Sequence, residues 1–105
     1  MNEYIAVAAA DELKPAQMKR VLVNGKKLLL CNSAGTLYCV DEMCSHEDYS
    51  LYLGCIKDGK IKCSLHGSYF DLTTGNPTCD PADEAIRTYK VKLEAGKVWV
   101  KPSPD

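Results

Sequence analysis

Closely spaced turn signals constrain the fold of this chain more than any other feature of its sequence. Asn24-Gly25 and Asp58-Gly59 are dipeptides typical of two-residue hairpin loops, and further turns are expected at 32–35 and at Ala95-Gly96. The segments around these turns are rich in β-branched, aromatic and other apolar residues. No long run shows helical periodicity, and only 10–15 is expected to form a helical turn. The pattern therefore indicates an all-β sandwich or barrel in which most neighbouring strands are antiparallel.

The expected strands can be placed by their position between the turns. They are predicted at 18–23, 26–31, 36–40, 55–57, 60–62, 68–72, 86–93 and 98–100. Residues 41–53 alternate poorly and carry cysteine, histidine and acidic residues together, which is typical of a loop that holds a functional site.

Length and composition restrict the function classes. With 105 residues the chain is predicted to be a single domain, 1–105, and its 46% hydrophobic and 26% charged residues are typical of a globular protein. The net charge of −1 argues against nucleic acid or an anionic membrane as a partner. Neither a membrane span nor a secretory signal is recognisable, so a cytoplasmic location is expected. The six cysteines are then expected to be thiols or metal ligands rather than disulfides.

Two short motifs combine the side chains that bind transition metals. Cys44 and His46 form the first, Cys63 and His66 form the second, and together they read C-x-H-x16-C-x-x-H. These are the only two histidines in the chain. Two thiolates and two imidazoles suit either one tetrahedral zinc ion or a two-iron cluster with unlike ligands on its two irons. Zinc fingers usually pair Cys with Cys and His with His, whereas each motif here supplies one of each, which favours the cluster.

The motifs resemble those of the Rieske [2Fe-2S] proteins, and the C-S-L-H-G-S sequence of residues 63–68 is similar to the family's second cluster loop. The resemblance implies a Rieske-like antiparallel β-sandwich with a small cluster-binding subdomain at about 41–81. It implies one [2Fe-2S] cluster, with Cys44 and Cys63 on one iron and His46 and His66 on the other. Pro81 matches a third, proline-bearing loop of the family.

The resemblance also implies a function. The chain is similar to the ferredoxin components of bacterial aromatic-ring-hydroxylating dioxygenase systems, which are electron carriers and not enzymes. The expected partners are a flavin-containing NAD(P)H reductase and a terminal Rieske oxygenase, and a monomer is expected. No histidine remains for an oxygenase iron site, and no G-x-G-x-x-G motif is present for a dinucleotide. Two alternatives stay open: a structural metal-binding interaction module, and the small subunit of a nitrite reductase.

Acidic residues gather around the first and third of these loops. Residues 41–50 and 80–84 hold seven of the fourteen acids and none of the thirteen bases. The seven acids are Asp41, Glu42, Glu47, Asp48, Asp80, Asp83 and Glu84. Their functional interpretation is a docking surface for basic partners, and the alternative is two solvated loops.

The other cysteines and the large aromatic residues are expected to be structural. Cys31, Cys39, Cys55 and Cys79 are predicted to be small apolar residues in strands and turns, and Phe70, Tyr89 and Trp99 are predicted to belong to the core.

Overall fold

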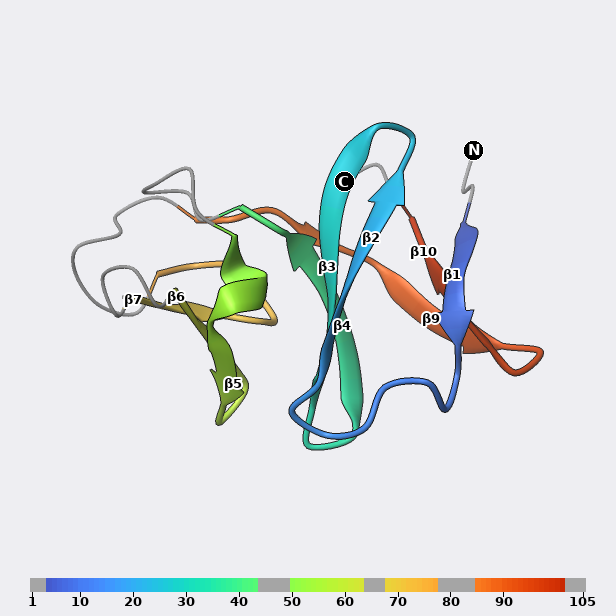
Figure 1. The fold of residues 1–105 in the computed structure, drawn as a ribbon, viewed down its shortest axis with the longest axis horizontal. Coiled ribbons are helices and arrows are strands. Elements are labelled where there is room, and N and C mark those ends of the chain that lie inside the picture. The colour runs from blue at the N-terminus through green and yellow to red at the C-terminus, as the bar shows by residue number, and fades with distance from the viewer. Residues whose placement is uncertain (1–3, 44–49, 64–67, 78–84, 102–105) are drawn as a thin grey trace.

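The computed structural model describes residues 4–43, 50–63, 68–77 and 85–101, and these residues form short strands joined by turns (Figure 1). The strands are β1 (Ile5–Ala9), β2 (Met18–Val23), β3 (Lys26–Ser33), β4 (Thr36–Asp41), β5 (Cys55–Lys57), β6 (Lys60–Cys63), β7 (Ser68–Asp71), β8 (Thr88–Tyr89), β9 (Val91–Glu94) and β10 (Lys97–Val100). One 3-10 turn, η1 (Leu51–Leu53), precedes β5. No helix among these described residues is long and apolar enough to cross a membrane.

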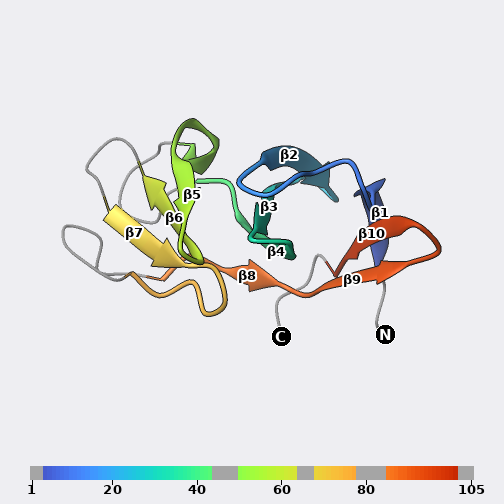
Figure 2. The ribbon, with the colours of Figure 1, turned by 90° about the horizontal axis from the view of Figure 1, so that it is seen from below.

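The strands form three antiparallel sheets. Their orders are β1-β10-β9, β2-β3-β4-β8 and β5-β6-β7, and every strand pair described is antiparallel. The β2-β3-β4 strands lie between the other two sheets, as Figure 2 shows. The predicted all-β, antiparallel fold is confirmed.

Residues 28–33 of β3, within the central sheet, are buried on both faces, which explains why this strand is apolar without alternation. Leu29 packs in one core cluster with Ile61 and Phe70 of the β5-β6-β7 sheet. Leu28 and Leu30 point the other way and pack in a second cluster that includes Val98 and Val100 of β10. A strand covered on both faces needs apolar residues at successive positions, and 28–31 supplies them. The predicted core positions of Phe70 and Tyr89 are confirmed, whereas Trp99 is only partly buried.

The hairpin turns have the backbone that their sequences predict. Both central residues have positive φ at Asn24-Gly25 (50° and 79°), Asp58-Gly59 (53° and 74°) and Ala95-Gly96 (54° and 73°), as type I′ turns require. Asparagine, aspartate and glycine adopt this left-handed conformation more readily than alanine does.

Four segments differ from the sequence prediction. Residues 10–15 form turns rather than helix, and Ile5–Ala9 is a strand because it pairs with β10. Leu51–Leu53 forms the 3-10 turn. The strand expected at 86–93 is divided: β8 pairs with β4, whereas β9 pairs with β10 in a different sheet. Its alternating pattern is compatible with either partner, so only the tertiary pairing reveals the change at Lys90.

Candidate metal centre

Three segments that the sequence assigns to the site lie outside the described residues: 44–49, 64–67 and 78–84. Three predicted ligands, Cys44, His46 and His66, fall in them, as does Pro81. Cys63 is the last residue of β6, where its backbone pairs with Ser68 at the start of β7. The structure therefore shows how the ends of these segments are brought together.

Each pair of neighbouring segment ends is joined by a direct contact. The first and second meet where Gly54, after η1, packs against Lys62, the residue before Cys63. Strand β7, which follows the second, reaches the third through the bridge between Phe70 and Pro77. The first and third are joined by β4 and the chain before β8, because Asp41 N–H donates to the carbonyl of Arg87 at 3.0 Å. All three pairs of ends thus belong to one connected framework.

Asp41 strengthens the last of these joints with its side chain. Its Oδ1 accepts a 2.6 Å hydrogen bond from the Tyr89 hydroxyl, and its Oδ2 accepts a 3.2 Å hydrogen bond from Arg87 N–H. Burial, reinforced by the hydrogen bond to Asp41, raises the pKa of Tyr89 well above its usual value. The phenol therefore keeps its proton and remains a donor at neutral pH.

Glu42 closes the base of the first segment. It is buried, with 8% of its surface exposed, and its carboxylate accepts a 2.6 Å hydrogen bond from Ser50 Oγ. Its carbonyl accepts from Leu51 N–H at 2.6 Å, and the neighbouring Met43 bridges Ser50. Asp41 and Glu42 therefore serve the framework, and for these two acids neither the docking surface nor the alternative of solvated loops describes their role. The other five lie outside the described residues.

The described cysteines restrict which thiols can ligate a metal. Cys31 and Cys39 lie in opposite core clusters, and burial raises the pKa of Cys31 to about 12 and that of Cys39 further still. Metal binding needs a thiolate, so neither residue is suited to it. Cys55 lies in strand β5, within the predicted strand, and is an exposed free thiol, while Cys79 lies outside the described residues. Within residues 4–43, 50–63, 68–77 and 85–101, no group of three metal-binding side chains occurs.

The donors that remain suit an iron-sulfur cluster. Two thiols, Cys44 and Cys63, and two imidazoles, His46 and His66, belong to segments whose ends the framework joins. This is the mixed thiolate and imidazole set of a Rieske centre, and these residues could hold one.

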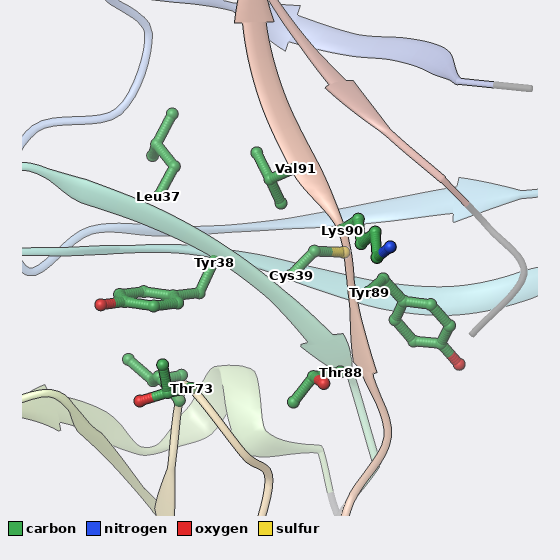
Figure 3. A pocket seen from close by; sticks show the side chains of 9 residues that line it. Leu37, Tyr38, Cys39, Thr73, Thr88, Tyr89, Lys90 and Val91 are labelled. Atoms are coloured by element: carbon green, nitrogen blue, oxygen red, sulfur yellow. The ribbon is translucent and has the colours of Figure 1, made fainter. Parts of the chain in front are cut away.

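A cavity elsewhere on the molecule offers no comparable chemistry. It has a volume of about 250 Å³ and lies beside β4, β8 and β9, with Leu37, Cys39 and Val91 among its lining residues (Figure 3). Its lining contains neither a carboxylate nor an imidazole, and its one thiol, Cys39, is protonated. The cavity is therefore not a second candidate for a metal centre.

Sequence reasoning missed Gly54 and the structural roles of Asp41 and Glu42. Gly54 had a recognisable signal, because an isolated glycine next to a strand often marks a close backbone approach. No local signal distinguished Asp41 from the other acids, since its partner Tyr89 is 48 residues away.

Comparisons with known proteins identify the family. A model of the Rieske [2Fe-2S] domain matches residues 3–90. A relative from Ralstonia sp., the ferredoxin component of naphthalene 1,2-dioxygenase/salicylate 5-hydroxylase systems, is 34% identical over 95% of this chain and 96% of its own length.

Two solved structures are also similar. The ferredoxin of carbazole 1,9a-dioxygenase from Nocardioides aromaticivorans has a TM-score of 0.90 and 29% identity, over 95% of this chain and 98% of its own. A chain in a complex of reduced oxygenase and oxidized ferredoxin in carbazole 1,9a-dioxygenase has a TM-score of 0.92 and 25% identity, over 100% and 98%. The match decides between the two metal centres left open by the ligand types, in favour of the [2Fe-2S] cluster. The chain belongs to the Rieske [2Fe-2S] domain family.

Proposed function

We propose that this protein is the ferredoxin component of an aromatic-ring dioxygenase system, in which it carries single electrons to the terminal oxygenase. The observation that carries the proposal is similarity along nearly the whole length of dedicated ferredoxin components. Because 95% of the chain matches 96% of the Ralstonia relative, little of this chain is left over for an additional catalytic module.

The proposed ligands are Cys44, His46, Cys63 and His66, within a single domain whose cluster-binding part spans about 41–81. The cluster supplies a centre that takes up and releases one electron at a time. The two thiolates and the two imidazoles would hold the cluster. Because the imidazoles are neutral, this ligand set leaves less negative charge on the cluster than four thiolates would. Rieske centres accordingly have potentials of roughly −150 to +300 mV, against about −400 mV for plant-type ferredoxins.

The proposed partners are a flavin-containing NAD(P)H reductase and a terminal Rieske oxygenase, in the cytoplasm, with the protein acting as a monomer. Support for the second partner comes from the similar chain found in a complex of oxygenase and ferredoxin. Reduction of a nitrite reductase, in place of a ring-hydroxylating oxygenase, would favour the alternative role in nitrite reduction.

The five acids outside the described residues are proposed to attract basic partner surfaces. Electron transfer from the reductase and to the oxygenase should then slow as ionic strength rises, since salt screens exposed charges over a Debye length of about 10 Å at 0.1 M. Stopped-flow rates that do not depend on salt would remove this docking surface from the proposal.

The ligand set is tested on anaerobically purified protein. Iron, acid-labile sulfide and an EPR signal after dithionite reduction are expected, and a colourless protein with a single zinc ion would refute the assignment. Cys63→Ser and His66→Ala should each lose or alter the cluster. The matched control is Cys55→Ser, because Cys55 is exposed and free and its loss should leave iron content and spectrum unchanged.

A further inference from the structure

The backbone at Gly54 lies so close to the backbone at Lys62 that no side chain fits between them. Gly54 links η1 to β5, and a Cβ there would overlap the carbonyl oxygen of Lys62 and lie 2.9 Å from its carbonyl carbon. The φ of Gly54 is −94°, outside the left-handed region, so the conformation alone does not call for glycine. The contact with Lys62 does.

Neither side of this contact is free to move away. Lys62 lies in β6, the central strand of its sheet, and is paired with Cys55 on one side and Tyr69 on the other. On the opposite side, Gly54 N–H donates to the carbonyl of Leu51 at 3.0 Å, and Leu51 is fully buried in the core. A side chain at Gly54 would therefore press on backbone held in place from both directions.

The contact continues to the base of the first segment. Leu51 N–H donates to the Glu42 carbonyl at 2.6 Å, and Ser50 Oγ donates to the buried Glu42 carboxylate at 2.6 Å. Ser50 Oγ also accepts from Tyr52 N–H at 3.2 Å, which fixes the start of η1. Glu42 precedes Cys44 by two residues, and Lys62 directly precedes Cys63. A short series of contacts thus joins the positions next to both cysteines.

We propose that Gly54 is a positioning residue for the cluster: the absence of a side chain lets η1 lie directly on β6 and so sets the spacing between the Cys44–His46 and Cys63–His66 ligand pairs. This inference rests on the ligand set proposed above. Gly54 does not touch the cluster in this proposal and acts only through the ligands, because residues that orient the ligands of a metal centre also influence its properties.

The test compares Gly54→Ala with Gly59→Ala in the intact protein carrying its cluster. Gly59 lies in the turn of the same β5-β6 hairpin, where φ is +74° and nothing lies within 4 Å of an added Cβ. Alanine at Gly59 strains the backbone and lowers stability without pressing on Lys62. EPR g values and the midpoint potential of the reduced protein are measured, because both depend on the geometry of the ligands and not on overall stability.

We expect Gly54→Ala to shift the g values and the potential and to lose iron faster, and Gly59→Ala to keep the wild-type g values and potential. Ser50→Ala provides a milder variant if Gly54→Ala does not accumulate as folded protein. It removes the hydroxyl that joins Glu42 to η1 and should shift the g values in the same direction by less. Unchanged g values in both variants would overturn the inference, as would an equal shift in Gly59→Ala. A wild-type protein without a Rieske signal would instead refute the proposed ligand set.

Discussion

Replacing Tyr89 with phenylalanine should destabilise the protein by removing one hydrogen bond at the joint between β4 and β8. Tyr89 is 6% exposed, and its hydroxyl donates to the Asp41 carboxylate at 2.6 Å. Hydrogen bonds to charged groups contribute roughly 1.5–3 kcal/mol, and partial solvent access at this bond places the expected loss at about 1.5 kcal/mol. For a chain of this length, with an unfolding entropy near 2.1 cal/mol/K per residue, that loss lowers Tm by about 7 °C.

Thermal unfolding followed by circular dichroism on cluster-loaded protein measures the loss. Tyr38→Phe is the matched control, because within the described part of the chain the Tyr38 hydroxyl has no hydrogen-bond partner and the residue is also partly buried. A Tm for Tyr89→Phe within about 2 °C of that of Tyr38→Phe would refute the argument, since it corresponds to less than about 0.5 kcal/mol.

The pH dependence provides an independent check on the same residue. Burial, and then the hydrogen bond to Asp41, raise the pKa of Tyr89 in the folded protein, whereas the unfolded chain ionises near its ordinary value of about 10. The contribution of Tyr89 to the free energy of unfolding is therefore fully present below about pH 10 and is lost as the pH rises above that value. The advantage of the wild type over Tyr89→Phe should shrink by about 1.4 kcal/mol per pH unit in that range. A constant difference up to pH 11 would contradict the raised pKa.

Three further predictions concern the core, a turn and the free thiols. Ile61→Ala should lower the free energy of unfolding by about 3 kcal/mol, because Ile61 is fully buried. Leu22→Ala, at a residue that is 71% exposed, should change it by less than about 0.5 kcal/mol. Denaturant unfolding measures both changes, and equal effects would contradict the burial argument. Ala95→Gly should stabilise by about 0.5 kcal/mol, because φ is 54° there; a fall in the denaturation midpoint would be the opposite result. In the folded protein an alkylating reagent should modify the exposed Cys55 rapidly and spare the buried Cys31, because burial raises the pKa of Cys31 to about 12. Peptide mass spectrometry measures the labelling of each cysteine, and equal labelling rates would contradict this prediction.

Local signals were sufficient for most of the secondary structure. The turns at Asn24-Gly25, Asp58-Gly59 and Ala95-Gly96 were predictable because two adjacent residues decide whether the backbone can adopt positive φ. The apolar run at 28–31 likewise predicted a strand, although only the structure shows that two different sheets cover its two faces. Ile5–Ala9 was missed because its strand conformation depends on pairing with β10, far along the chain.

The ligand types were also readable without coordinates, since two cysteines and the only two histidines at matched spacing restrict the possible metal chemistry by themselves. The roles of the carboxylates and of the glycine near the ligands could not be predicted from the sequence. Asp41 and Glu42 look like the other acids until their partners Tyr89 and Ser50 are seen, and Gly54 acquires its meaning only from the Lys62 carbonyl. The physical reason is range: turn conformation and donor chemistry belong to residues and their neighbours in sequence. The joints between ligand segments, in contrast, arise from contacts between strands that only the folded chain brings together.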